Sequence, residues 1–367
     1  MSILHICCNY AGTTVFRDLF TCLHRVGVAQ QVYVPEKREK DMNKYADVPF
    51  PVTYSLIVRP WDRALYFTKA RRALPDIREK MDLSDVTLVH AHTLFTDGAM
   101  AYRLGLPYVV SVRFTDIEYF YKYMPHLRGY AEKILRAARR VVFLSPVARE
   151  KVLSRYVKDR AAIEKKCVVI PNGIDAAWLD GQAKNAPREE ICIGFSGKLT
   201  ARKQPLKALE AAAVYAQESG RRVRFLVAGD GELKEQLLGA PQARALLDYR
   251  GRLSGMDAMK AFYRECDVLL VPSTAETFGL CYLEAMSQGT PVLYTKGQGF
   301  DGQFAEGDAG FHVDASDVRD MARRIGDCLD GYEARSARCV SLSRALEWSG
   351  VAARMGEMYR EVEACES

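Results

Sequence analysis

Two glutamates, Glu276 and Glu284, flank the start of a predicted helix in the second half of the chain, with seven residues between them. The apolar run at residues 268–271 predicts a buried parallel strand, and the helix is expected over residues 280–288, before a glycine. A helix N-terminus offers free N–H groups and positive partial charge, which suit a diphosphate. Because carboxylates repel phosphates, the two glutamates suit sugar or ribose hydroxyls instead. The stretch therefore predicts a site for a ligand that carries both a diphosphate and hydroxyl groups.

A basic loop upstream supplies the positive charge that the glutamates lack. The segment FSGKLTARKQP at residues 195–205 ends a predicted strand at Gly197 and continues with Lys198 and Lys203. A small residue lets the backbone approach an anion, and lysines neutralise the anion. A second tight turn, AGDG at residues 228–231, follows another predicted strand but does not match the dinucleotide-binding fingerprint. Each loop taken alone is typical of a solvated surface turn.

An alternation of apolar strands and helices must position these loops, and it occurs twice along the chain. The repetition predicts an α/β fold of two doubly wound, Rossmann-like parallel-sheet domains with a cleft between them. The predicted domains are residues 1–170 and 171–347, and residues 348–367 are expected to form a helix that packs back onto the first domain. The expected strands are residues 2–8, 31–35, 86–90, 108–112, 140–144 and 167–170 in the first domain, and 191–195, 223–228, 248–251, 268–271 and 292–294 in the second.

The composition is that of an ordinary globular protein. The chain has 367 residues, of which 49% are hydrophobic and 27% charged, enough to bury two full cores. No apolar run approaches the roughly 20 residues of a membrane span, and the N-terminus lacks the pattern of a signal peptide. Ten cysteines are scattered without a C-x-x-C pair, which favours reduced thiols over a metal site or a disulfide framework. We therefore expect a cytoplasmic protein that holds no metal.

The positive charge is concentrated in the first half of the chain. Residues 1–170 hold 28 Lys and Arg against 17 Asp and Glu, whereas residues 171–367 hold 24 against 29. This split favours an anionic partner of the first domain, for which a membrane surface, an anionic polysaccharide and a nucleic acid are candidates. No nucleic-acid recognition module accompanies the charge, so we expect no nucleic acid. The basic, aromatic-rich segment 113–140 is either a solvated helix with core aromatics or a face that meets anionic lipid.

Several motifs together resemble glycosyltransferase family 4. The most specific is VPSTAETFGLCYLEAMSQGTPVL at residues 271–293, which follows FSGKL and LVAGDGEL in the order expected for that family. The segment CVVIPNGID at residues 167–175 resembles the entry to the second domain, and ILHICCNYAG and VHAHTLFTDG fit the first domain more loosely. The resemblance implies the GT-B architecture of two domains and retaining sugar transfer from a nucleotide-sugar.

The resemblance also implies roles for residues of the second domain. Lys198 and Lys203 would hold the donor diphosphate with the backbone around Gly197, Glu276 would bind hydroxyls of the donor sugar, and Glu284 would bind the ribose. The stretch around Tyr249 to Leu253, which includes Arg252, would border the base. The backbone amides expected to cap the phosphates are those of Phe278, Gly279 and Leu280.

In the first domain the resemblance is less complete. Gly12 lies in the loop that would approach the donor phosphate or the acceptor. Many relatives have a histidine after the strand at residues 108–112, whereas this chain has Arg113 there. Arg113 is therefore the expected catalytic contact, and His90 and His92 are the alternatives. Both histidines are also typical of a strand end that hydrogen bonds to neighbouring loops.

The leading hypothesis is a metal-independent, retaining glycosyltransferase in cell-surface glycan synthesis. The expected donor is a nucleotide-sugar, and the resemblance to the family implies that the nucleotide is UDP. The expected acceptor is a saccharide or a lipid-linked molecule. No cofactor is expected besides the donor substrate. The protein is expected in the cytoplasm, with a peripheral position on the inner face of the cell membrane as the further expectation. The alternatives are a GT-B nucleotide-sugar epimerase and a non-catalytic nucleotide-sugar-binding protein.

Overall fold

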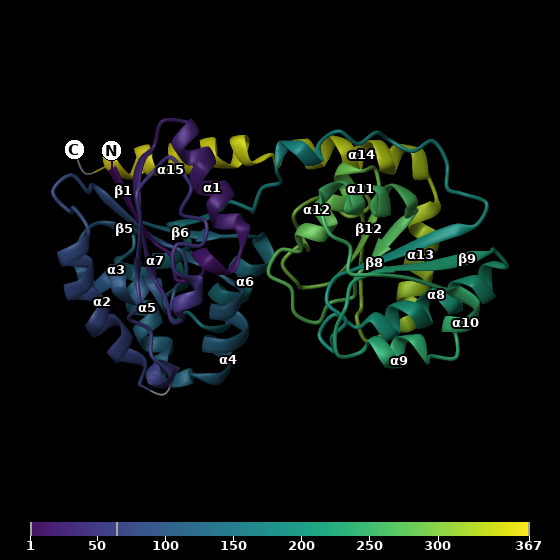
Figure 1. Cartoon of the computed structure of the whole chain (residues 1–367), viewed down its shortest axis with the longest axis horizontal. Helices are drawn as coiled ribbons and strands as arrows, with labels where there is room; N and C mark the ends of the chain where they lie inside the picture. Colours follow the sequence, from purple (N-terminus) through teal and green to yellow (C-terminus); the bar gives the residue numbers. More distant parts are fainter. Residues whose placement is uncertain (1, 64, 366–367) are drawn as a thin grey trace. The chain divides into compact units, whose positions relative to one another are not determined.

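The computed structural model describes residues 2–63 and 65–365 (Figure 1). The chain forms two compact units. Unit 1 comprises Met1–Gly173 and Trp348–Ser367, and unit 2 comprises Ile174–Glu347. No helix in the described ranges is long and apolar enough to cross a membrane.

Unit 1 is built on a seven-stranded parallel sheet in the order β3-β2-β1-β4-β5-β6-β7. Its strands are β1 (Ser2–Ile6), β2 (Ala29–Pro35), β3 (Val52–Ser55), β4 (Leu88–Ala91), β5 (Tyr108–Val112), β6 (Arg140–Phe143) and β7 (Cys167–Val169). Its helices are α1 (Thr14–Arg25), α2 (Tyr66–Lys80), α3 (Asp97–Leu104), α4 (Tyr121–Tyr123), α5 (Arg128–Ala137), α6 (Pro146–Arg155), α7 (Arg160–Glu164) and α15 (Trp348–Ala364).

Unit 2 repeats the plan with a six-stranded parallel sheet in the order β10-β9-β8-β11-β12-β13. Its strands are β8 (Ile191–Ser196), β9 (Val223–Ala228), β10 (Leu247–Gly251), β11 (Val268–Leu270), β12 (Val292–Thr295) and β13 (Gly310–Val313). Its helices are α8 (Pro205–Ser219), α9 (Lys234–Leu238), α10 (Ala243–Leu246), α11 (Met256–Glu265), α12 (Leu280–Ser287), α13 (Val318–Leu329) and α14 (Tyr332–Arg344).

The two sheets confirm the predicted fold class. Their inner strands are apolar and buried, as expected when helices cover both faces of a parallel sheet. The sequence analysis missed the third strand of unit 1 and the last strand of unit 2. Both are four residues long, and β13 begins at a glycine, which is usually a sign of a loop.

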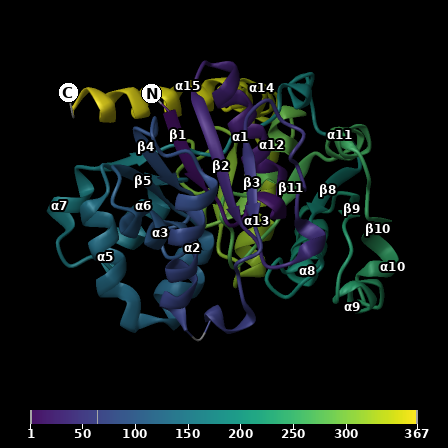
Figure 2. The ribbon, with the colours of Figure 1, turned by 60° about the vertical axis from the view of Figure 1, so that its left-hand side comes forward.

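The final helix, α15, packs against α1 and so belongs to unit 1 (Figures 1 and 2). Tyr359 on its buried face hydrogen bonds to His90 at the end of β4. At its start, the Trp348 ring lies over Gly173, where an added Cβ would come within 2.6 Å of the ring. Gly173 therefore has a packing role at the end of the first segment of unit 1.

The strand orders place a switch point in each sheet. In unit 2 the chain moves outward on either side of the neighbouring strands β8 and β11, and in unit 1 on either side of β1 and β4. Ligands of open parallel sheets bind at such points, beyond the C-terminal ends of the strands. Residues 197–204 follow β8 and residues 271–279 follow β11. The basic loop and the Glu276 loop therefore meet at the switch point of unit 2.

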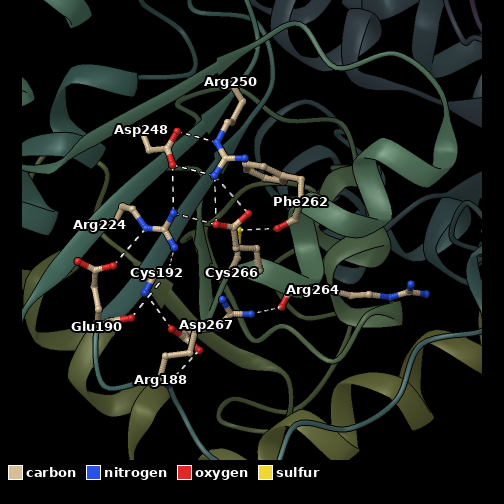
Figure 3. A network of polar contacts seen from close by, with 11 residues as sticks. Arg188, Glu190, Cys192, Arg224, Asp248, Arg250, Phe262, Arg264, Cys266 and Asp267 are labelled. Atoms are coloured by element: carbon tan, nitrogen blue, oxygen red, sulfur yellow. Dashed lines mark hydrogen bonds and ion pairs between the residues drawn. The ribbon is translucent and has the colours of Figure 1, made fainter.

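An ion-pair network holds the opposite, N-terminal edge of the unit 2 sheet (Figure 3). The guanidinium of Arg224 lies 3.4 Å from Glu190, 3.1 Å from Asp248 and 2.9 Å from Glu265. Arg250 makes further ion pairs to the last two of these carboxylates. Glu190 precedes β8, Arg224 and Asp248 lie near the starts of β9 and β10, and Glu265 ends α11, whereas Arg250 lies near the end of β10. The ion pairs of Arg224 therefore have a structural role away from the switch point.

Arg224→Met is expected to lower the free energy of unfolding by about 1–2 kcal/mol, because three partly buried carboxylates lose a shared cation. The loops at the switch point should stay unchanged, since they lie at the other edge of the sheet. Urea unfolding measures the effect. Arg222→Met is the matched control, because its ion pair with Glu189 is exposed and should contribute nothing measurable. Equal stability of Arg224→Met and the wild type would contradict the role of the network.

Candidate functional site

Two loops of unit 2 are joined at the switch point by backbone contacts. The Thr274 amide donates to the Arg202 carbonyl at 2.9 Å, and the Arg202 guanidinium donates to the Ala275 carbonyl at 3.1 Å. In the basic loop, Gln204 has a φ of 53°, a left-handed conformation that is uncommon outside glycine. This turn starts helix α8 and holds Lys203 toward the other loop.

Lys203 and Glu276 form an ion pair at the centre of this junction. The side chain of each is only 12% exposed. The loop after β12 supports the glutamate, because Gln298 Oε1 accepts from the Glu276 amide at 3.0 Å and the Gly299 amide donates to the Glu276 carbonyl at 3.1 Å. A largely desolvated ion pair of this kind strengthens the local charge interaction and fixes both side chains.

Helix α12 begins beside this pair with its backbone donors unused. Gly279 precedes the helix with a φ of 83°, which favours glycine. Within the described ranges, no acceptor takes a hydrogen bond from the amides of Phe278, Gly279 or Leu280. Unused donors at a helix start, next to a lysine, make an anion-binding arrangement.

Glycines allow the loop after β9 to pack on the loop after β8, and the loop after β12 to pack on the loop after β11. A Cβ added to Gly229 would come within 1.9 Å of the Gly197 carbonyl oxygen, and one added to Gly231 within 2.5 Å of the Leu199 oxygen. A Cβ at Gly299 would come within 1.8 Å of the Thr277 oxygen. The AGDG turn therefore packs directly on the basic loop. Its glycines are required by this close packing and not only by the turn itself.

Glu284 lies on the second turn of α12, and its carboxylate accepts a hydrogen bond from Tyr263. The Tyr263 hydroxyl lies 2.9 Å from Glu284 Oε2 and 3.1 Å from Ser196 Oγ. Burial raises the pKa of the Glu284 carboxyl, and the hydrogen bond from Tyr263 opposes that shift. The carboxyl is therefore positioned to accept from a ligand hydroxyl near the end of β8.

The other predicted residues of unit 2 lie along the same edge of the sheet. Lys198 is exposed, and its ammonium has no ion-pair partner in the described part of the chain. Arg252 is exposed and Leu253 half-buried, directly after β10. The Gly251 carbonyl accepts from the Gly229 amide at 2.8 Å, which ties the start of this segment to the AGDG turn. The structure thus brings the predicted residues of unit 2 into neighbouring loops.

In unit 1, Arg113 follows β5 with its guanidinium largely buried. Arg113 Nη1 donates to Asn172 Oδ1 at 3.1 Å, and the guanidinium lies 4.9 Å from the centre of the Phe16 ring. Its Nε has no hydrogen-bond partner among the described residues, and burial lowers its pKa to about 10. Gly12 is exposed just before α1, with open space where a Cβ would stand. Arg113 is thus an incompletely paired cation at the C-terminal edge of the sheet.

His90 and His92 are sealed in the core of unit 1 with His5. His90 hydrogen bonds to Tyr359 at 2.6 Å and to Ser111 at 2.9 Å. This closed network favours the structural interpretation of the His-Ala-His motif over contact with a sugar.

The hydrogen bonds assign the protons of two of these rings. Gln30 Nε2 donates to the Phe20 carbonyl, so its Oε1 faces His5 Nε2 at 3.0 Å and accepts from it. Burial lowers the pKa of His5 to about 3, and the neutral ring therefore accepts at Nδ1 from His92 Nε2, 3.0 Å away. His92 Nδ1 then carries a lone pair without a partner in the described structure. Burial also lowers the pKa of His90 and His92 well below the usual value.

These neutral rings predict acid sensitivity. The unfolded chain takes up protons at histidine below pH about 6.5 and the folded core does not, so stability should fall as the pH drops from 6.5 toward 3. In urea unfolding, His92→Gln should reduce the slope of stability against pH by up to about 1.4 kcal/mol per pH unit between pH 6.5 and 4. Equal slopes for wild type and His92→Gln would contradict the buried neutral network.

A hollow lies beyond the C-terminal ends of the unit 1 strands. Two adjoining pockets of about 220 and 180 Å³ share Lys37, Val58, Lys69, Thr96 and Phe120 in their walls. Both pockets are therefore continuous with the loops that follow the strands of the unit 1 switch point.

Three cations and three carboxylates line this hollow, the carboxylates being those of Glu36, Asp62 and Asp116. The ammonium groups of Lys37 and Lys69 and the guanidinium of Arg59 make no ion pair with any described carboxylate, and Lys69 bonds only to the Cys8 sulfur at 3.2 Å. Asp62, in the same wall, is already paired with Arg72. Glu36 and Asp116 accept from backbone amides, and Asp97 interacts with the charge of Lys69. Lys37 and Arg59 are therefore the cations of the hollow that best suit an anionic group.

The sequence analysis did not identify these three cations, nor the residues that hydrogen bond to the glutamates and hold them in place. Gln298 and Gly299 lie in a glycine-rich stretch after β12, which signals a turn but not its contact with Glu276. Lys69 lies in a segment that is basic throughout, so nothing in the sequence distinguished it from its neighbours.

Two family models match the chain in succession. The model described as Glycosyltransferase Family 4 matches residues 12–178, and the one described as Glycosyl transferases group 1 matches residues 178–340. The chain belongs to glycosyltransferase family 4.

Two curated relatives illustrate the family. This family 4 chain is 30% identical over 197 residues to the D-inositol 3-phosphate glycosyltransferase of Corynebacterium urealyticum, covering 49% of this chain and 45% of that one. It is 30% identical over 250 residues to the phosphatidyl-myo-inositol mannosyltransferase of Mycolicibacterium smegmatis, covering 64% and 60%. The aligned region thus spans about half the length of these relatives.

Solved structures show that the family 4 chain has the GT-B architecture. Sucrose-phosphate synthase from Thermosynechococcus elongatus superposes with a TM-score of 0.78 at 18% identity, over 100% of both chains. The Anabaena protein HepE in complex with UDP superposes with a TM-score of 0.73 at 16% identity, over 98% of this chain and 100% of that one. At these identities the likeness concerns the fold alone.

Proposed function

We propose that this protein is a retaining glycosyltransferase that uses a nucleotide-diphosphate sugar. The observation that supports this most strongly is the Lys203–Glu276 ion pair in front of unused backbone donors at the start of α12. A diphosphate would take the amides of residues 278–280 and the ammonium of Lys203, and Glu276 would be left to accept from sugar hydroxyls. Glu284 would accept from the ribose, and the backbone after β10 would border the base.

The chemistry of this arrangement is stabilisation of a leaving group. Cleavage of the bond between the sugar and the diphosphate places negative charge on the phosphate, where Lys198, Lys203 and the fixed amides would stabilise it. These cations would supply the charge that a metal ion supplies in other enzymes. The acceptor would attack the face from which the phosphate leaves, and the leaving phosphate would take its proton, which gives retention.

Further observations support a donor base and an acceptor class. The Anabaena HepE structure was solved with UDP, which favours a UDP-sugar here. The unpaired cations of the unit 1 hollow favour an acceptor with an anionic group, and the names of both curated relatives contain a phosphorylated inositol. A lipid-linked or saccharide phosphate of cell-surface glycan synthesis, in a cytoplasmic enzyme, fits this chemistry. Gly12 and Arg113 remain the proposed contribution of unit 1 to substrate binding.

A thermal-shift screen of nucleoside diphosphates and nucleotide-sugars tests the proposal. A ligand at a hundredfold excess over its Kd should stabilise the folded protein by about 2.7 kcal/mol, and we expect UDP or a UDP-sugar to do so. A panel in which no nucleotide changes the Tm would contradict it. Product analysis without an acceptor separates the alternatives: an epimerase would convert the donor, a transferase would at most hydrolyse it slowly, and a binding protein would leave it intact.

A further inference from the structure

Exposed apolar side chains are concentrated at one end of unit 1. In the described ranges nine large apolar side chains are exposed, and seven of them lie between residues 56 and 123. Trp61 is 54% exposed, Leu65 57% and Tyr123 63%. Such a concentration is unusual for a surface that meets only water, because single exposed apolar residues are normally scattered.

Four of these side chains, Phe67, Tyr102, Tyr119 and Tyr123, belong to one series of ring contacts, and Trp61 and Leu65 directly precede it in the sequence. We call the six together the aromatic surface. Rings in contact run from Tyr102 through Tyr130 and Phe67 to Tyr66, and on through Phe120 and Tyr119 to Tyr123, with centroid separations of 4.8–6.2 Å across the surrounding ring cluster. The helices that carry the first of these rings, α2, α3 and α5, lie side by side in Figure 2. The aromatic surface consists of Trp61, Leu65, Phe67, Tyr102, Tyr119 and Tyr123.

Cations lie among these rings. The Arg103 guanidinium is 5.2 Å from the centre of the Phe67 ring, and the Lys122 ammonium is 5.2 Å from that of Tyr123. Lys122 has no ion-pair partner among the described residues, as is also true of the cations of the hollow. The nearby carboxylate of Glu118 is already paired with Lys151. The surface is therefore apolar and positive at once, which complements an anionic lipid interface.

The hollow of unit 1 opens at the same end. Arg59, Pro60 and Tyr119 line the larger pocket, and Trp61 lies in the turn at Pro60–Arg63 beside it. Both this turn and Tyr119 follow strand ends, β3 and β5, at the C-terminal edge of the sheet. An anionic head group could enter the hollow while its acyl chains stay among the exposed rings.

We infer that the aromatic surface binds an anionic phospholipid bilayer and that the hollow takes the phosphorylated head group of a lipid-borne acceptor. The aromatic rings would lie at the level of the head groups, where Trp and Tyr are favoured, and the cations would contact lipid phosphates. The second part of this inference rests on the proposed function, whereas bilayer binding does not.

Vesicle co-sedimentation of the full chain, without any nucleotide, tests the inference. Phosphatidylcholine vesicles that contain phosphatidylglycerol should sediment the wild type at low salt, and raised salt or pure phosphatidylcholine should release it. The triple variant Trp61→Ser, Leu65→Ser, Tyr123→Ser should bind at least about tenfold more weakly, and Lys122→Gln about fivefold. Leu238→Ser and Arg319→Gln, at exposed sites of unit 2, are matched controls that should bind like the wild type.

Two results would overturn the inference: wild type that stays in the supernatant with anionic vesicles at low salt, or a triple variant that sediments as well as wild type. An equal loss in Leu238→Ser would likewise remove the assignment to this surface. Each variant is also tested for its UDP-induced Tm shift, which should be unchanged because none of the substituted residues belongs to the nucleotide site. A Tm shift with UDP but no vesicle binding would support the transferase proposal and contradict bilayer binding. Vesicle binding without a Tm shift for any nucleotide would support bilayer binding and contradict the transferase proposal.

Discussion

Lys203→Ala is expected to lower kcat/KM for sugar transfer by at least about a hundredfold, the usual effect of removing one preorganised group that stabilises transition-state charge. The effect should be large because Lys203 is held in place by its ion pair with Glu276 and is only 12% exposed. Glu276→Gln should be comparably inactive, since an uncharged side chain no longer positions the lysine and accepts sugar hydroxyls less strongly. Steady-state kinetics with the donor found in the nucleotide screen measures both effects.

Lys207→Ala is the matched control for Lys203→Ala. Lys207 lies one turn further along the chain on α8, but its ammonium bonds to the Ala315 carbonyl at 3.2 Å instead of facing the site. Its loss should change kcat/KM by no more than about twofold. Near-wild-type turnover in a folded Lys203→Ala protein would remove this lysine from the mechanism.

Gly299→Ala is expected to weaken UDP-sugar binding at least about tenfold, because small displacements of positioning groups have large effects on a site. The added Cβ would stand 1.8 Å from the Thr277 oxygen and 2.9 Å from the Glu276 oxygen, so the loop that carries Glu276 must move. The overpacking should also lower stability by about 1–3 kcal/mol. Calorimetric titration and urea unfolding measure the two effects separately.

Gly326→Ala, within helix α13, serves as the comparison. Its Cβ would meet only the Tyr215 ring, at an ordinary 3.8 Å, and alanine favours a helix over glycine by about 1 kcal/mol. This variant should bind the donor normally and be no less stable. Unaltered donor affinity in Gly299→Ala would show that the β12 loop does not position Glu276.

The sequence predicted the fold because both sheets are parallel. Strands buried on both faces form continuous apolar runs, and these runs alternate with helices in a way that restarts at Ile191. β13 was missed for a physical reason. It begins at Gly310, where a Cβ would come within 1.8 Å of the Val292 oxygen, so close strand packing requires the residue that usually signals a loop.

The candidate site was predictable only in part. The glutamates and lysines could be read from residue type and from their position after strands, since the switch point brings those loops together. Their supports could not, because Tyr263 and Gln298 act through tertiary contacts that leave no local pattern. The same applies to His5, whose contacts with Gln30 and His92 make the His-Ala-His motif a core feature.

The most direct test of the central claim is amide hydrogen exchange of the intact protein with and without UDP. We predict slower exchange on UDP addition at residues 278–281 and at the loop 197–203, because the diphosphate would accept from the amides that start α12 and would fix the basic loop. Arg224→Met should show the same protection, since its ion pairs lie at the opposite edge of the sheet. Unchanged exchange at the start of α12 under saturating UDP, or protection confined to other strand ends, would contradict the assignment of the nucleotide site.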